Sequence, residues 1–280
     1  MCKDLPLYFK IATLRHASTL YIDRDGQPTG AGERHDYQPI NIDYTFADFN
    51  KTLNQNRTIL EHFGEEAGFN DGDIRALFKG AGFDRLVMAG GGVPRDVLSL
   101  FLLGLSAVDA ANGGRIGKDD VRLLSKTNFG LKNEELKQDS KTDEQSDLIK
   151  GIYIIRNFCL DRKTNVFLVE EKALQQDDNW RALIYRLLDY RIIHTCASSL
   201  THKSLEGTYQ AFAVDIGCYA HFRKLEGRLN EIEVSADDAK ERMRSVPVLD
   251  WAKVVSSAET LPGNIELILL AQDEEEDETI

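Results

Sequence analysis

The sequence predicts a mainly α protein with an α+β C-terminal part, in which a helical bundle is followed by a winged-helix domain. Apolar residues recur at steps of three and four through residues 45–130, which is the period of a helix with one buried face. Beyond residue 146 the expected elements come in the order helix, strand, helix and hairpin. This is the order of a winged helix, with the hairpin as its wing.

The N-terminal segment, residues 1–44, predicts a strand and a loop. Leu7–Leu14 is rich in apolar and aromatic residues and predicts a strand that needs partner strands from elsewhere. Because it begins so early, we expect the chain to be the rear portion of something larger. Residues 23–39 contain Asp-Gly and Gln-Pro pairs, which predict an irregular loop.

Residues 45–140 predict a compact bundle of helices. Asp43 and Thr45 are suited to cap a helix that begins near Phe46. The later helices are expected at residues 71–79, 84–88, 94–111 and from residue 121 onward. The polar segment Leu131–Asp147 marks either a domain boundary or an exposed helix extension.

The winged-helix domain is expected at residues 141–225 and a C-terminal extension at 226–280. Within the winged helix, helices are predicted at 146–160 and 177–189, and strands at 164–169, 191–198 and 208–216. In the extension, a helix is predicted at 235–253 and a strand at 264–270. The run of six acids at 273–278 is expected to be a solvated tail.

Charge and composition exclude several classes. The net charge is −12, half of it from the acidic tail, so a strong non-specific grip on nucleic acid is not implied. The longest apolar stretch, Leu98–Val108, is too short to span a membrane. No export signal is visible and the four cysteines are scattered, so we expect reduced thiols and a cytoplasmic protein without a membrane partner.

The stretch Gly90–Asp96, "GGGVPRD", looks like a phosphate loop but lacks the Gly-Lys-Ser/Thr of a P-loop. It predicts a helix start instead, because Pro94 fits the first helical position and Asp96 the first turn. Arg95 is unfavourable there, since a helix N-terminus repels cations. An anion bound there would meet both free N–H groups and Arg95. The alternative is that Arg95 pairs with Asp96 or with a surface acid.

Two His/Cys pairs, His194 with Cys196 and Cys218 with His221, raise the question of zinc. The tight Cys-x-x-Cys pairs of structural zinc sites are missing. Buried or half-buried core positions explain these residues better, and we expect no metal site.

A winged helix also suggests DNA. Arg181 and Arg186 lie on the helix that would enter a major groove, and Lys203 lies at the wing tip. Acidic residues flank the same helix and would repel phosphate: Asp177, Asp178 and Asp189. We therefore favour a wing that contacts protein or regulates the bundle, with DNA binding as the alternative.

Three segments together resemble the rear half of bacterial AAA+ ATPases related to the origin-recognition class. They are "LYFKIATLRHASTLY" (7–21), "IDYTFADF" (42–49) and "FDRLVMAGGGVPRDVLSLF" (83–101). The resemblance covers roughly residues 5–225. It implies that residues 1–44 are a remnant of the ATPase core, with its last strand, that 45–140 are the helical AAA+ lid, and that 141–225 are the winged helix.

The resemblance also implies a role for particular residues. In this family a Gly-x-Pro-Arg at a lid-helix start carries the sensor-2 arginine, which reaches the ATP γ-phosphate. Pro94 and Arg95 occupy that motif here. Thr13 and Arg15 match the sensor-1 region at the end of the last core strand, with Lys10 a weaker match. Arg95 and Arg15 are thus the expected catalytic residues, and Thr13, Pro94 and Arg95 the expected ATP-binding ones.

The family's Walker A loop and Walker B strand have no counterpart in this sequence. Phosphoryl transfer depends on a P-loop lysine and a held magnesium ion. We therefore expect ATP, with magnesium, only where a missing core segment or another protein chain completes the site. The alternatives are a non-enzymatic DNA-binding or regulatory interaction module and a pure protein-interaction scaffold.

Overall fold

The computed structural model divides the chain into two units, Met1–Ile42 and Asp43–Ile280. It describes residues 10–13, 21–24, 27–30, 36–38, 40, 45–110, 114–140, 142–222 and 227–257. Residues 10–13, the described part of the strand predicted at Leu7–Leu14, form no strand.

The N-terminal unit contains a short hairpin where an irregular loop was predicted. Strand β1 (Tyr21–Arg24) pairs antiparallel with β2 (Gln27–Gly30), and Tyr21 lies opposite Gly30. The strands are separated in the sequence by Asp-Gly, a pair that favours two-residue hairpin turns. The loop prediction at residues 23–39 was therefore wrong for this part, because the Asp-Gly pair connects two strands.

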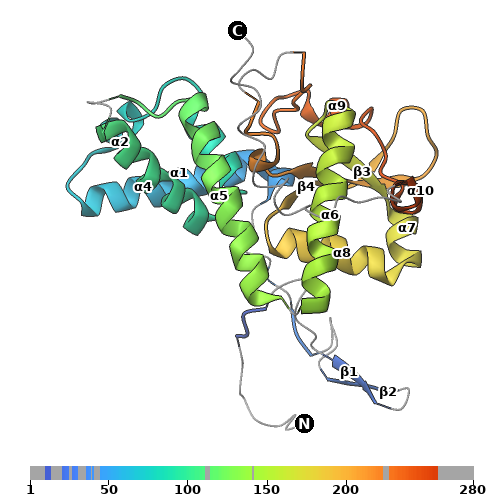
Figure 1. Ribbon diagram of the computed structural model, residues 1–280. Coiled ribbons are helices and arrows are strands. Elements are labelled where there is room, and N and C mark those ends of the chain that lie inside the picture. Colours follow the sequence, from blue (N-terminus) through green and yellow to red (C-terminus); the bar gives the residue numbers. More distant parts are fainter. Residues whose placement is uncertain are drawn as a thin grey trace, which may run out of the picture. The chain divides into compact units, whose positions relative to one another are not determined.

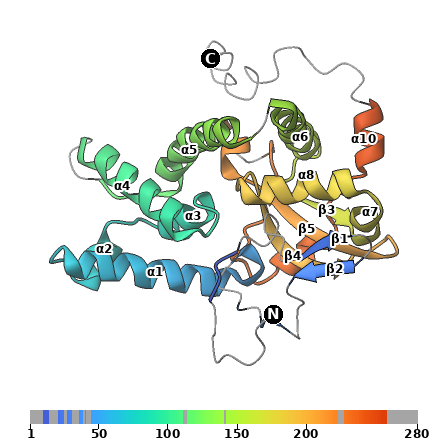
Figure 2. The same cartoon turned by 90° about the horizontal axis from the view of Figure 1, so that it is seen from below.

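Helices fill one side of the second unit (Figures 1 and 2). They are a short 3-10 helix η1 (Phe46–Asp48), α1 (Phe49–Glu66), α2 (Asp71–Ala76), α3 (Gly82–Ala89), α4 (Pro94–Ala110) and α5 (Lys118–Asp139). The Thr45 hydroxyl accepts a hydrogen bond from the Ala47 N–H and caps η1 as predicted. The predicted cap Asp43 lies outside the described residues. Helix α5 extends into the polar segment Leu131–Asp147 as far as Asp139, and buried Lys132 and Leu136 anchor this extension. The next helix begins within the segment at Thr142.

The other side of this unit combines helices with a small sheet. Its elements are α6 (Thr142–Asp161), β3 (Val166–Glu170), α7 (Glu171–Gln176), α8 (Asp178–Asp189), β4 (Ile193–Thr201), β5 (Thr208–Val214) and the 3-10 helix η2 (Ile216–Cys218). The three strands are antiparallel in the order β3-β5-β4. The predicted order of helices and strands is confirmed, with α7 as an additional short helix.

The single helix predicted at 235–253 is wrong. Two short helices, α9 (Ala239–Met243) and α10 (Trp251–Ser257), flank an extended segment. The Pro247 carbonyl accepts from the Leu168 N–H at 3.0 Å, and the Leu249 N–H donates to the Leu168 carbonyl at 2.7 Å. The segment therefore pairs with β3, and proline prevents it from continuing a helix. The strand predicted at 264–270 and the acidic tail lie outside the described residues.

Buried side chains form one continuous core across the second unit. The rings of Trp180 on α8 and Trp251 on α10 stack with centroids 4.4 Å apart. Helix α5 and η2 approach so closely that a Cβ on Gly217 would lie 2.3 Å from the Phe129 Cβ. The helices at 45–140 and the sheet region thus belong to one compact unit. Within the described part of the chain, no helix has the length and apolar character of a membrane span.

Candidate functional site

The glycine stretch turns the chain between α3 and α4. Gly91 and Gly92 have φ angles of +64° and +75°, a left-handed conformation that other residues adopt only with strain. The Gly92 N–H donates to the Val87 carbonyl at 2.9 Å and closes the end of α3. A Cβ on Gly90 would lie 2.6 Å from Val97 Cγ2. These glycines therefore serve a tight reversal and close helix packing.

Three other elements hold this turn in place. The Asn56 side-chain amide on α1 donates to the Gly92 carbonyl at 2.9 Å, in a buried position. His194 of β4 lies directly under Gly91, where an added Cβ would lie 2.5 Å from the ring. The His194 ring also packs against the Phe46 ring of η1, and the two ring centroids are 4.7 Å apart. The position of the α4 start is thus determined by side chains from α1, η1 and β4.

Arg95 projects from the first turn of α4, and Pro94 is the first residue of that helix, as predicted. The Arg95 side chain is 67% exposed, and its Nε donates to Asp96 Oδ1 at 3.2 Å. This is the partner that the alternative interpretation of Arg95 predicted. Only the arginine of this pair is exposed, since the Asp96 side chain is 9% exposed, and water that reaches the guanidinium screens its attraction to the carboxylate. The exposed guanidinium can therefore also contact another anion.

Asp96 is shared between two arginines. Its Oδ2 lies 2.6 Å from Arg191 Nε as an ion pair without hydrogen-bond alignment. The second arm of Arg191 reaches Glu135 Oε2 at 2.7 Å. Asp96 and Arg191 are both largely buried, with side chains 9% and 19% exposed. Their ion pair joins the start of α4 to the connection between α8 and β4.

A second, fully buried ion cluster lies behind this pair. Lys132 Nζ lies 2.6 Å from Asp215 Oδ2 and donates to the Arg191 carbonyl at 3.1 Å. His194 Nε2 lies 3.3 Å from the same Asp215 oxygen. Burial lowers the pKa of His194 below its ordinary value. The ring is therefore neutral near pH 7, and its Nε2–H donates to the carboxylate.

Asp215 keeps its charge despite its burial. Burial by itself raises the pKa of Asp215, but the attraction of Lys132 and the hydrogen bond from His194 outweigh burial, so the pKa lies below its ordinary value. The Gly217 N–H donates to the other carboxylate oxygen at 2.8 Å. Lys132 and Asp215 thus form a balanced ion pair beside the neutral imidazole of His194, and the two charges neutralise each other within the cluster.

Of the remaining residues expected at the ATP site, Thr13 is exposed and belongs to the N-terminal unit. Arg15 lies outside the described residues. Lys10 is exposed and in no regular element. Of the residues expected at the ATP site, the structure therefore places Pro94 and Arg95 together at the start of α4, where Asp96 and Arg191 are their charged neighbours.

The three cations expected to bind DNA are all ion-paired within the chain. Arg181 pairs with Asp178 at 2.6 Å, Arg186 with Glu144 at 2.8 Å and Lys203 with Glu241 at 3.0 Å. Lys203 lies in the β4–β5 connection, as predicted. Trp180, Ile184 and Leu187 of α8 face the core. The positive charge expected on α8 and the wing is thus largely balanced by neighbouring acids.

Three of the four residues considered for zinc, His194, Cys196 and Cys218, are buried in the core, and His221 is half-buried. Cys196 and His194 are buried, and the Cys196 thiol contacts the His194 carbonyl at 3.7 Å. Burial raises the pKa of Cys196 and of Cys218 to about 12, so both thiols stay protonated. Within the described ranges no three His, Cys, Asp or Glu side chains gather as metal ligands would.

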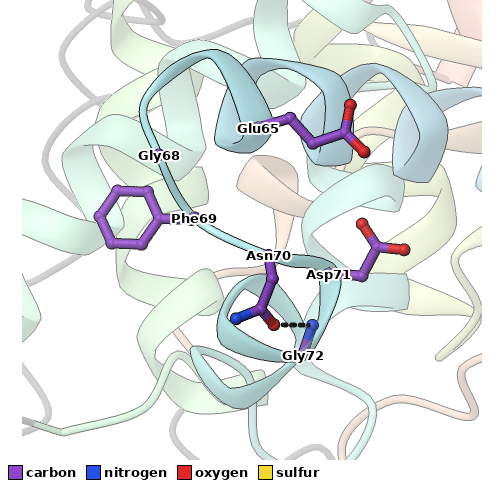
Figure 3. Close-up of a pocket in the computed structure, with 6 residues that line it drawn as sticks. All are labelled: Glu65, Gly68, Phe69, Asn70, Asp71 and Gly72. Atoms are coloured by element: carbon purple, nitrogen blue, oxygen red, sulfur yellow. Dashed lines mark hydrogen bonds between the residues drawn. The ribbon is translucent and has the colours of Figure 1, made fainter.

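Two surface hollows lie away from Arg95. The larger, of about 610 Å³, is an open depression at the α1–α2 turn, where the carboxylates of Glu65 and Asp71 point to the same side and Phe69 points away (Figure 3). Its other lining residues are Gly68, Asn70 and Gly72. The second, of about 380 Å³, lies between α1, α2 and α3. None of the residues expected to touch ATP or DNA lines either hollow.

Sequence reasoning missed Lys132, Arg191 and Asp215. Lys132 lies 59 residues before Arg191 and 83 residues before Asp215 in the chain, so no local pattern links the three residues. One signal was available for Arg191, which follows the end of a helix at a position where glycine is usual.

Comparisons with protein-family models, with curated proteins and with solved structures found no match to this chain. Its function is therefore inferred from its residues, from the resemblance of three segments and from the geometry of the α4 start.

Proposed function

We propose that this chain is the lid and winged-helix portion of an AAA+ ATP-binding protein, and that Arg95 contributes a sensor-2 arginine to a nucleotide site completed elsewhere. One observation carries the proposal. Arg95 lies at the start of a 17-residue helix with its side chain 67% exposed, and among the described residues its one ion pair is to its neighbour Asp96.

The start of α4 has the chemistry that a terminal phosphate needs. The unpaired N–H groups of a first helical turn and the helix dipole both favour a bound anion. Arg95 adds a permanent positive charge and up to five N–H donors. Because Asn56 and His194 fix the preceding glycine turn, these donors are presented in a defined position. Preorganised donors of this kind stabilise the charge that develops during phosphoryl transfer.

The rest of an ATP site has to come from elsewhere. A P-loop lysine and a magnesium-binding hydroxyl are needed to cradle the phosphates, and the sequence contains no Gly-Lys-Ser/Thr. ATP bound there would supply the phosphoryl group. This chain would supply charge and position at its γ-phosphate, through Arg95. Thr13 and Arg15 are proposed to contribute from the sensor-1 region.

The test is ATP hydrolysis by the complete assembly, in which a Walker-bearing segment or chain is joined to this one. Arg95→Ala should lower the hydrolysis rate at least about tenfold, because it removes one preorganised cation. Arg115→Ala, which removes another exposed arginine, is the matched control and should leave the rate unchanged. The chain alone should show only weak ATP binding. Equal rates for the two variants would refute the sensor role.

A regulatory or DNA-binding module is the second candidate, favoured by the β3-β5-β4 sheet and the helices around it. The ion pairs of Arg181, Arg186 and Lys203 favour the regulatory, protein-contacting form over DNA binding. Cys159, Cys196 and Cys218 are free thiols, which supports a reducing, cytoplasmic location.

A further inference from the structure

Arg191 has a backbone conformation that is unusual for its residue type. Its φ angle is +59°, in the left-handed region. Its N–H donates to the Leu188 carbonyl at 3.0 Å, and the next N–H, of Ile192, donates to the Leu187 carbonyl at 2.9 Å. These bonds close the C-terminus of α8 at a position where glycine is usual. An arginine is strained there, which indicates that its side chain has a task.

That side chain joins three elements. Its Nε lies 2.6 Å from Asp96 on α4, and its Nη2 lies 2.7 Å from Glu135 on α5. Its own carbonyl accepts from Lys132, also on α5. Arg191 therefore connects the start of α4 to the α8–β4 connection through a largely buried contact.

Arg95 and Arg191 share one buried carboxylate, because they contact different oxygens of Asp96. Asp96 is 9% exposed, so its charge needs a partner. Arg191 lies closer to Asp96 than Arg95 does, at 2.6 Å against 3.2 Å, and is far less exposed. With Arg191 in place, Asp96 is neutralised from the interior and Arg95 keeps its charge for another anion.

We propose that Arg191 is a positioning residue that keeps Arg95 available to a phosphate by holding Asp96. This inference rests on the proposed function, because the phosphate is the one that Arg95 would touch there. Without Arg191, the buried Asp96 carboxylate has Arg95 as its remaining cation among the residues that the structure describes. The hydrogen bond that Arg95 already donates to Asp96 then strengthens, and less of the Arg95 charge is left for a ligand.

The decisive variant is Arg191→Gly, which removes the side chain and relieves the left-handed backbone. Arg191→Asn, which also tolerates this conformation, is the second variant in case glycine loosens the turn. Glu135→Gln is the matched control, because it removes the charge of the other carboxylate that Arg191 contacts and leaves the Asp96 pair. The double variant Asp96→Asn/Arg191→Gly removes the carboxylate together with its clamp, and should free Arg95 again.

The first readout needs no ligand. Nitrogen-15 NMR measures the water exchange of the Arg95 Nε–H in the full chain. We expect exchange to slow at least about threefold in Arg191→Gly, because a charge-assisted hydrogen bond to Asp96 strengthens. It should return to the wild-type rate in the double variant and stay unchanged in Glu135→Gln.

The second readout is the dissociation constant of inorganic tripolyphosphate at low salt. Arg191→Gly should weaken binding about fivefold or more, and the double variant should restore it. If Arg95→Ala leaves tripolyphosphate binding unchanged, the proposed function fails while the NMR readout still decides the role of Arg191. Unchanged exchange in Arg191→Gly, or no recovery in the double variant, would overturn the inference.

Discussion

Replacement of Lys132 by methionine tests how far burial controls the energetics of this unit. Lys132 and Asp215 are 2% and 0% exposed, with Nζ and Oδ2 2.6 Å apart. Removing one partner of a buried pair leaves a charge that water cannot reach, at a cost of about 3–5 kcal/mol. Asp215 keeps two other donors, from His194 and Gly217, so we expect a loss near the lower end, about 3 kcal/mol.

Helix α5 offers a matched control. Lys118 pairs with Glu233 at the same 2.6 Å, but the two side chains are 49% and 45% exposed. Lys118→Met should cost less than about 1 kcal/mol, because water screens the pair. Each variant thus removes a lysine–carboxylate pair of the same length from the same helix, and the two pairs differ in how deeply they are buried.

Denaturant unfolding measures the difference, since a lower midpoint at constant slope reports lost stability. Lys132→Met removes the attraction that lowers the pKa of Asp215 most, so we expect burial, the largest single influence, to raise this pKa above its unfolded value. The folded state then gains protons more readily as pH falls, so the deficit against wild type should shrink between pH 7.5 and 5.5. Equal losses for Lys132→Met and Lys118→Met, or a deficit that grows as pH falls, would refute the argument.

Three further predictions concern the same unit. Gly91→Ala combines a left-handed φ of +64° with a clash against His194, whereas Gly68→Ala has a φ of +86° and open space. We expect thermal unfolding to show a loss of about 1 kcal/mol for Gly68→Ala and clearly more for Gly91→Ala, and equal losses would contradict the packing argument. Burial lowers the pKa of His194, so as pH falls the unfolded chain binds a proton on this imidazole before the folded chain does. The contribution of neutral His194 to folding stability is therefore complete above about pH 6.5 and falls as pH drops toward the folded pKa. Urea titrations at pH 7.5 and 5.5 should show a smaller pH effect in His194→Gln, and an unchanged effect would count against this assignment. The chain should not bind duplex DNA at about 50 mM salt, because Arg181 and Arg186 of α8 and Lys203 of the β4–β5 connection are ion-paired. A gel-shift assay that shows binding, with an affinity that falls steeply as salt rises, would disprove this.

Local chemistry predicted much of this fold and little of its ionic network. Pro94 begins α4 because a missing N–H is harmless there, and this is visible in the sequence. Pro247 was also visible, yet it lies inside residues 235–253, where a single helix was predicted. The pairing of Pro247 and Leu249 with Leu168, some eighty residues earlier, decides the structure of that segment. Contacts of this range leave no local pattern.

The candidate site divides in the same way. The position of Arg95 at a helix start could be predicted, because it depends on adjacent residues. Its pair with Asp96 was one of the two interpretations, because the two residues are adjacent. The pair of Asp96 with Arg191 could not be predicted, because Arg191 belongs to a connection nearly one hundred residues later and has no periodic pattern. Likewise, His194 was expected to be a core residue, but its contacts with Gly91 and Asp215 could not be predicted from the sequence.

These contacts make the start of α4 part of the sheet region. The glycine turn rests on His194 of β4, and Asp96 is paired with Arg191 just before β4. A partner that displaces β4 would therefore disturb both supports of Arg95 at once. Because energetic coupling between two binding sites is reciprocal, an anion held by Arg95 should change the affinity of such a partner by the same factor. The glycines of "GGGVPRD" would thus affect an anion at Arg95 indirectly. Because Gly91 has no side chain, the His194 ring can pack against the turn that positions the start of α4.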